Sequence, residues 1–448
     1  MFFRSVTLAF ATMVVSASPQ DHAIGLAFPL FDYPENTPQT YHLPSMSQSL
    51  ELSKSFYQGT HYLIDKAFTN PKYAWLELAA ELSFDLLSLY LPFGDSWLHE
   101  EWHRSVLAYH GIDSFNEIYL FRLFSPAISV SRVADVDLIG LKANHPADMI
   151  RLHAAGIEGQ YAHLNGLAQE RFFFDKNHYG RVFNLALAIN SIFYVLLSTT
   201  QYADNLAADF LEEEGRDIGD RDFTGWDFTA WVYDLFRPEE PYQARGIHPS
   251  GVGINRYITT DDLTGKEIRF LRMQGALALL NLADPHLYGF NGIDQFEASW
   301  QWYARHLLTS FGYTVDITTL CKLNHYNLLL TLHNQANHHR YFPGLTLAVF
   351  ELPLGGDAEG PGLVVDASAG ISLQPANQRF HSTDYAGIYT VEARLRGYVT
   401  PMLGGFIAAG YKSAGWRMGY PTVEKMGRMS VGVSCSFNSS GASATRPE

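Results

Sequence analysis

Cysteine and positive charge are both scarce in this chain. Only Cys321 and Cys435 occur among 448 residues, so one disulfide is the most that can form and a disulfide scaffold is excluded. Neither cysteine has another near it in sequence, which argues against cysteine ligation of a metal. Lys and Arg total 31 against 46 Asp and Glu, for a net charge of −15. Because nucleic-acid binding needs basic patches, we expect no nucleic-acid partner.

Several signatures of common enzymes are also missing. The chain has no Gly-x-Ser-x-Gly turn, no phosphate-binding glycine loop and no Cys-x-x-Cys pair. Long apolar runs are few, and the best candidate for a membrane span, residues 182–200, is interrupted by Asn184 and Asn190. Two interpretations stay open: helices buried against each other, and a helical bundle embedded in or apposed to a membrane.

The first residues have the pattern of a secretory signal. Met1 to Arg4 form a short basic region, residues 6–15 are apolar, and Ala17 ends a small-residue cleavage site. We predict that residues 1–17 are a signal peptide and that the protein is exported, to the periplasm or outer membrane of a bacterial envelope. A buried N-terminal strand or helix is the alternative.

The spacing of apolar residues changes along the chain. After an extended segment, 18–45, the spacing is mostly helical over 46–342, with a Gly- and Pro-punctuated loop or lid at 212–265. From 343 to 437 it alternates with a period of two, and 438–448 form a polar tail that we expect to be mobile. The prediction is an α+β protein, in which a large, mainly helical domain precedes a small antiparallel β-meander.

The predicted meander contains five alternating runs: 345–352, 363–373, 389–399, 403–411 and 429–437. These runs resemble bacterial outer-membrane-type β-strands, although five strands are too few to close a barrel. We therefore expect a sheet with one face packed on the helical domain or on itself. Val391 and Val431 should point away from Glu392 and Arg394, because side chains alternate between the two faces of a strand.

The most informative stretch is Trp97 to His103, which contains His99-Glu100-x-x-His103. Residues four apart lie on one face of a helix, so the two imidazoles should project from the same side. Together they can hold one zinc ion, with Glu100 placed to polarise a water molecule. This stretch resembles the HExxH zinc metallopeptidases (zincins), and the resemblance covers the motif and one later helix.

The resemblance also implies a third metal ligand. Zincins with two histidine ligands and one glutamate take the glutamate from a later helix, and Glu158 follows His103 by 55 residues, a separation similar to that of some gluzincins. Asp148, His153 and His163 are the weaker alternatives. The simpler interpretation is a tight helix crossing with Glu158 in solvent.

Small residues around Glu158 favour close approach of its helix to another one. They are Ala154, Ala155, Gly156 and Gly159. Glycine in a helix interior costs stability relative to alanine, so we expect a packing reason for the two glycines.

What the resemblance implies about function is zinc-dependent peptide-bond hydrolysis, with Zn²⁺ as the cofactor and a peptide or protein as the substrate. Glu100 would be the general base, and a further donor would stabilise the oxyanion. The sequence leaves four candidates for that donor: Tyr109, His110, Tyr161 and His163.

A second histidine-rich stretch suggests another class of enzyme. His333, His338 and His339, taken with the first motif, faintly resemble the histidine boxes of membrane di-iron desaturases and hydroxylases, which implies oxidation of an apolar substrate. The simpler interpretation is a polar helix end before Pro343. A third hypothesis is a non-enzymatic envelope structural or assembly protein whose helix turn only mimics the motif. Association with a membrane stays open in all three.

Overall fold

The computed structural model describes residues 23–37, 40–68, 70–118, 128–174, 181–324, 326–354, 362–400 and 402–438. The predicted signal peptide lies outside the described residues, as does all of the predicted tail except Asn438.

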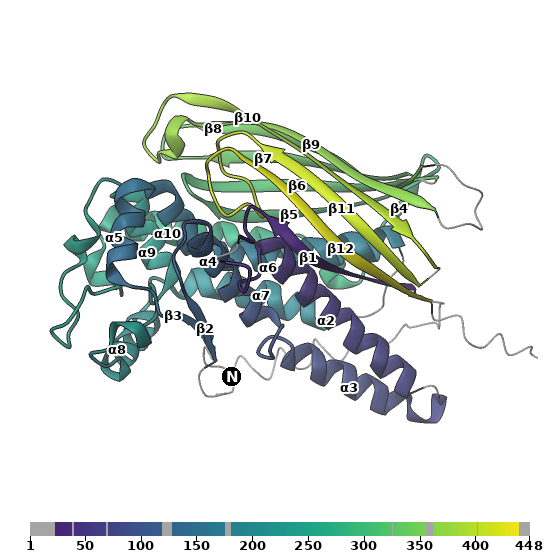
Figure 1. Cartoon of the computed structure of the whole chain (residues 1–448), viewed down its shortest axis with the longest axis horizontal. Coiled ribbons are helices and arrows are strands. Elements are labelled where there is room, and N and C mark those ends of the chain that lie inside the picture. The colour runs from purple at the N-terminus through teal and green to yellow at the C-terminus, as the bar shows by residue number, and fades with distance from the viewer. Residues whose placement is uncertain are drawn as a thin grey trace, which may run out of the picture.

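Ten strands form one antiparallel sheet, in the order β1-β12-β11-β10-β9-β8-β7-β6-β5-β4. The first strand therefore pairs with the last, and in Figure 1 the purple β1 runs beside the yellow β12 while the sheet curves over the helices. The strands are β1 (Ala23–Tyr33), β4 (Ile293–Gln295), β5 (Ala298–Thr309), β6 (Gly312–Leu323), β7 (Tyr326–Ala336), β8 (Tyr341–Pro353), β9 (Leu363–Pro375), β10 (Tyr385–Tyr398), β11 (Leu403–Lys412) and β12 (Met426–Asn438). A separate hairpin pairs β2 (Phe115–Ile118) with β3 (Ile128–Ser131).

The α+β class is as predicted, but the balance between helix and sheet is not. The five alternating runs after residue 343 form β8 to β12, in the antiparallel arrangement that the alternation indicates. The expectation of a small sheet is wrong, because β4 to β7 and β1 bring it to ten strands. Helical spacing over all of 46–342 is wrong for the same reason, and β7 pairs with β8 across the expected boundary at 343.

Burial on both faces explains why β5 has no strand pattern in the sequence. Its seven residues from Tyr303 to Thr309 are all buried. Where both faces are covered, apolar residues do not alternate with polar ones, and a period of two is lost.

Nine described helices lie along the concave side and one end of the sheet (Figure 1). They are α2 (Met46–Ala67), α3 (Ala74–Leu87), α4 (Asp95–Tyr109), α5 (Asp135–Asn144), α6 (Pro146–Phe174), α7 (Arg181–Leu197), α8 (Gln201–Glu213), α9 (Asp227–Phe236) and α10 (Gly265–Ala278). The long α6 is central, since most of its 29 residues are buried. Ile157 and Tyr161 of α6 share one core with Leu187 of α7 and Trp231 of α9.

Among the described helices, none is by itself long and apolar enough to cross a membrane. Only α7 and α8 taken together, bent by 86° where they meet, have the necessary length and composition.

The polarity of the sheet is inverted relative to an ordinary core sheet. Val391 and Val431 point away from Glu392 and Arg394, as predicted, but the charged side chains face the helices and the apolar ones face outward. Arg394 of β10 donates to Glu51 of α2, which places this side of β10 against the helical layer.

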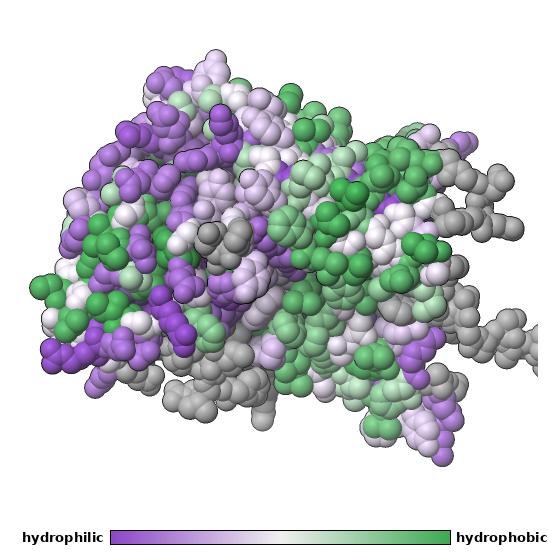
Figure 2. All heavy atoms as spheres, viewed as in Figure 1, coloured by the Kyte–Doolittle hydropathy of each residue, from purple (hydrophilic) through white to green (hydrophobic). Residues whose placement is uncertain are grey.

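The outward face is apolar over seven neighbouring strands, β6 to β12. One outward residue from each of six of them is between 42% and 67% exposed: Ile317, Leu332, Leu347, Ile371, Val391 and Ile407. On the opposite face of the same strands lie Thr318, Thr331, Thr346, Gly370, Thr390 and Phe406, most of them buried. In Figure 2, hydrophobic residues gather over the part of the surface that the strands occupy.

Candidate metal centre

Helix α4 presents His99 and His103 to α6 at very short range. A side-chain carbon added to Gly156 would lie 2.3 Å from His99 Nε2 and 2.4 Å from His103 Nε2. Gly159, one turn further along α6, gives the same access to Trp102, whose Cγ would be 2.8 Å from an added carbon. The expectation that the small residues of this helix permit a close crossing is therefore confirmed.

The carboxylate that meets the two imidazoles is Asp227. Its Oδ2 lies 3.1 Å from His99 Nε2 and 3.5 Å from His103 Nε2, and all three residues are buried. One ligand atom from each can be chosen so that all lie within 4.8 Å of one another. Ligand atoms held 2.0–2.2 Å from one zinc ion are about 3.4 Å apart, so the spacing suits a single ion.

The assignment of Glu158 as the third ligand does not hold. Its carboxylate accepts two hydrogen bonds from Arg151, at 2.7 and 2.9 Å, and a third from the backbone N–H of Gly419. Arg151 precedes Glu158 by seven residues, two turns of α6, so the pair shares one face of the helix. Glu158 is buried, but as half of an ion pair.

The other residues singled out in the sequence also have partners elsewhere. Asp148 accepts from Thr422 and the N–H of Val423 and contacts His110, while His153 contacts Asp234. Three of the four candidate oxyanion donors have partners other than Asp227. His110 contacts Asp148, and Tyr161 contacts Asn281. The His163 ring packs against Tyr57 and Phe183. Tyr109 is on α4, but no contact with the centre is seen for it.

Tyr194 of α7 is the hydroxyl that reaches the centre. It donates to Asp227 Oδ2 at 2.9 Å, and its ring lies 5.7 Å from that of His99. Asp227 lies in the first turn of α9, where the helix dipole favours a negative charge. Although burial alone would raise it, His103 and His99 hold the pKa of Asp227 well below its usual range.

The two histidines differ in their surroundings. His103 donates from Nδ1 to the carbonyl of Leu152 at 2.6 Å, which leaves the lone pair on Nε2. That Nε2 is buried and makes no hydrogen bond. Burial lowers the pKa of His99. Burial also acts to lower the pKa of His103, but the nearby Asp227 carboxylate outweighs this effect, so the pKa of His103 is raised. An orphaned imidazole nitrogen aimed at a carboxylate is what a divalent cation would satisfy.

Acidic side chains cluster around this point. Burial, with Asp222 and Asp227 nearby, raises the pKa of Glu100 well above its ordinary value. Burial, Glu214 and Asp227 raise the pKa of Asp222 to about 7. Like charges that hold each other protonated are relieved by a bound cation, so the electrostatics favour a positive ion here.

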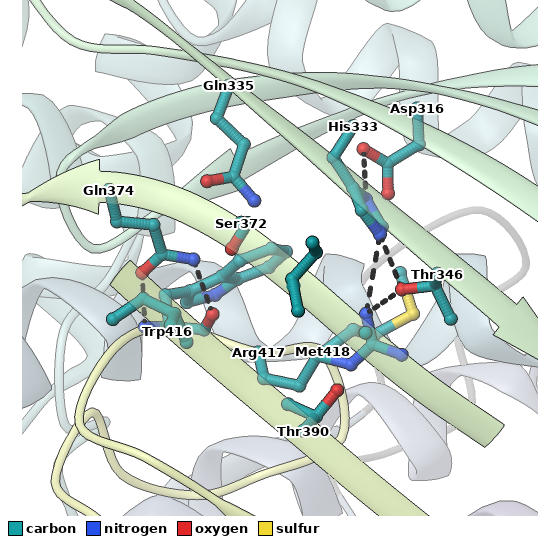
Figure 3. A pocket seen from close by; sticks show the side chains of 13 residues that line it. Asp316, His333, Gln335, Thr346, Ser372, Gln374, Thr390, Trp416, Arg417 and Met418 are labelled. Carbon is teal, nitrogen blue, oxygen red and sulfur yellow. Dashed lines mark hydrogen bonds and ion pairs between the residues drawn. The ribbon is translucent and has the colours of Figure 1, made fainter. Parts of the chain in front are cut away.

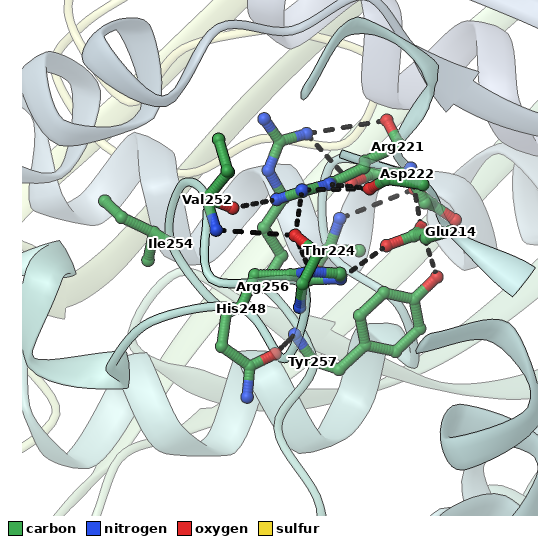
Figure 4. Close-up of polar contacts among 12 residues, drawn as sticks. Glu214, Arg221, Asp222, Thr224, His248, Val252, Ile254, Arg256 and Tyr257 are labelled. Atoms are coloured by element: carbon green, nitrogen blue, oxygen red, sulfur yellow. Dashed lines mark hydrogen bonds and ion pairs between the residues drawn. The ribbon is translucent and has the colours of Figure 1, made fainter. Parts of the chain in front are cut away.

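The segment that was expected to be a lid forms an ordered wall of the site. Two buried arginines hold it: Arg221 donates to the carbonyls of Gly215 and Val252, and Arg256 to those of Val133 and Asp222 (Figure 4). Between the anchored ends, Phe223 packs 5.0 Å from the ring of His103. Arg221 and Arg256 thereby fix the start of α9, and with it the position of Asp227.

His333 lies in a different polar cluster, on the inner face of the sheet. It is on β7, not at a helix end, with Nδ1 2.9 Å from Asp316 Oδ1 and Nε2 2.8 Å from Thr346 Oγ1. Figure 3 shows these side chains beside a cavity of about 30 Å³, with Arg417 donating to Thr346. That volume has room for ordered water but not for a larger ligand, so we regard the cluster as a buried polar network.

No family model, curated protein or solved structure matches the chain.

Proposed function

We propose that the protein is an exported zinc-dependent peptidase whose metal is held by His99, His103 and Asp227. The observation that carries the proposal is the convergence of two imidazoles from one turn of α4 on a buried carboxylate, with Glu100 on the same helix. Two nitrogen ligands and one oxygen ligand, with a further coordination position open, are typical of catalytic zinc.

The surrounding side chains suit the hydrolysis of a carbonyl compound. Bound zinc would supply Lewis acidity and bring the pKa of a water molecule towards neutrality. Glu100 is half-buried, so it can exchange protons with solvent, and as a carboxylate it would take the proton of the attacking water. The Tyr194 hydroxyl, already turned towards Asp227, is the candidate donor for the oxyanion.

The alternatives from the sequence are less well supported. In the described residues, His333 belongs with Asp316, while His338 and His339 belong to an exposed turn, so neither group joins His99 in one ligand set. The di-iron hypothesis thus has no second histidine box beside the first. The non-enzymatic hypothesis would require that His99, His103 and Asp227 hold no metal in the purified protein.

Metal analysis of the purified full-length chain tests the ligand set. We expect one zinc ion bound at this site, lost in Asp227→Ala because only two imidazoles then remain. Asp222→Asn is the matched control, since Asp222 is a neighbouring, half-buried carboxylate outside the set and should leave zinc in place. If Asp227→Ala retains zinc at the wild-type level while folded by circular dichroism, the ligand assignment is wrong. Two irons would favour the oxidase, and no metal the structural protein.

We also propose that the protein rests against lipid through the outward face of its sheet. Outward positions such as Leu332, Ile371 and Val391 carry no charge, and Trp300, Trp302 and Tyr326 are exposed on the same face. Tryptophan and tyrosine favour the boundary between lipid and water. An interface with a protein partner has about one hydrogen bond per 100–200 Å². This face has few groups that could form such hydrogen bonds, so lipid acyl chains fit it better.

Flotation with phosphatidylcholine vesicles tests the lipid face. Wild-type protein should float with the vesicles, and the double variant Ile371→Lys, Val391→Lys should not, because a lysine is unfavourable in lipid, by up to about 2–4 kcal/mol at the bilayer midplane and less near its surface. Val136→Lys is the control, since Val136 is 69% exposed but lies on α5, away from the sheet. A wild-type protein that stays in the aqueous fraction would contradict the proposal. So would a wild-type dimer that the double variant dissociates, which would assign the face to a second copy of the chain.

A further inference from the structure

Three exposed histidines meet at the end of the sheet, remote in sequence from the metal centre. His338 and His339 occupy the turn between β7 and β8, and His381 lies in the connection from β9 to β10. One ring nitrogen from each can be chosen so that all three lie within 4.8 Å of one another. The centroid of the His338 ring is 4.7 Å from that of His339 and 5.1 Å from that of His381.

The two turns are fastened to each other by the backbone. His338 donates its N–H to the carbonyl of Phe380 at 3.1 Å. The side chain of Asn337 donates to the carbonyls of Arg379 and Ser382, while its oxygen accepts from the N–H of His339. Asn337 is buried, so these bonds form away from bulk water. The relative positions of the two turns are therefore set before any ligand arrives.

Aromatic side chains of the core contact two of the three rings, those of His338 and His381. Phe380 is buried, and its ring packs 4.7 Å from that of Phe236, the last residue of α9, and 4.9 Å from that of Phe270 of α10. The His338 ring packs 5.3 Å from that of Phe380. Phe380 is part of the main core, so the chain that carries His381 is fixed next to that residue.

No carboxylate belongs to this group, in contrast to five other described histidines. His61, His99, His110, His153 and His333 each contact an aspartate. In the described structure His338, His339 and His381 form no ion pair and contact aromatic rings and one another. Three neutral imidazoles with free lone pairs are a donor set for zinc or copper, and a poor one for calcium or magnesium.

We propose that His338, His339 and His381 bind one divalent transition-metal ion, Zn²⁺ or Cu²⁺, at the surface. The ion joins the β7–β8 turn to the β9–β10 connection and keeps at least one coordination position towards solvent. This site is independent of the His99, His103 and Asp227 centre and of the hydrolysis proposed there.

Stoichiometry in the full-length protein tests the site. Metal-free protein is titrated with Zn²⁺ against a chromophoric chelator, and in a parallel series with Cu²⁺. Wild type should bind two zinc ions, while His381→Ala and Asp227→Ala should each bind one and the double variant none. His42→Ala, which removes an exposed histidine outside the group, should still bind two.

The outcomes separate the two metal proposals. His381→Ala should keep its hydrolytic activity and lose affinity only for the second ion, by more than about tenfold. Added metal should also raise the melting temperature of wild type by more than it raises that of His381→Ala, because a ligand that binds the native state stabilises it. Equal zinc and copper affinity in wild type and His381→Ala would overturn the surface site, whatever the result at Asp227. If Asp227→Ala binds as much metal as wild type while His381→Ala binds less, the surface site stands and the peptidase proposal fails.

Discussion

Gly156→Ala is expected to remove zinc from the proposed catalytic centre although it changes no ligand. The new carbon would lie 2.3–2.4 Å from the Nε2 atoms of His99 and His103, which is closer than real contacts allow. Both rings are buried and His103 is tied to Leu152, so the clash moves the ligand atoms themselves. An overpacking cost of about 1–3 kcal/mol corresponds to about 5- to 150-fold weaker zinc binding.

Competition with a chelator measures this loss, and Gly140→Ala provides the control. Gly140 lies in α5 with no atom within 4 Å of an added carbon, so alanine there should stabilise the helix by about 0.5–1 kcal/mol and leave zinc binding unchanged. Zinc binding by Gly156→Ala at the wild-type affinity would mean that these imidazole nitrogens do not face the ion.

Glu100→Gln is expected to give a folded protein that retains zinc and hydrolyses peptides about 10²- to 10⁴-fold more slowly, since only the general base is lost. A quenched-peptide mixture measures the rate, and metal analysis shows that the ion remains. Glu239→Gln, at an exposed ion pair with Arg379, should keep full activity. A Glu100→Gln protein with wild-type kcat would contradict the assigned role.

The metal-free form of the same variant gives a second, independent readout. The pKa of Glu100 is raised in the fold, so ionisation above the ordinary glutamate pKa of about 4.3 favours the unfolded chain. Glutamine removes this cost. Metal-free Glu100→Gln should therefore match wild type in stability near pH 4 and exceed it increasingly as the pH rises. A melting temperature below that of wild type at pH 8 would show that Glu100 is ionised in the metal-free fold.

Local patterns predicted half of the candidate site. The four-residue spacing of His99 and His103 and the small residues beside Gly156 are signals within single helices, and both hold. The third ligand could not be found in this way, because Asp227 follows His103 by 124 residues and lies on a different helix. Arg151, seven residues before Glu158 on the same helix face, was a signal that Glu158 already had a partner.

The strands that the sequence predicted differ from those that it missed in the same way. Strands β8 to β12 have one covered face and one exposed face, so their sequences alternate. Strand β5 is covered on both faces at one end, and β1 was seen only as an extended segment because its partner is near the other end of the chain. Strand pairing at such a distance leaves no trace in a local window.

The pairing of β1 with β12 has a consequence for how the protein is made. Ala27 lies opposite Ser434, so 407 residues separate two paired positions, and closing a loop of that length costs about 5 kcal/mol in chain entropy. During synthesis β1 has no partner until about 400 further residues have left the ribosome, and contacts of such high sequence separation form slowly. In the interval its Phe28 and Phe31 belong to an unpaired, aggregation-prone strand. Production of this protein should therefore be limited by chaperone supply during biogenesis, more than by the stability of the finished fold.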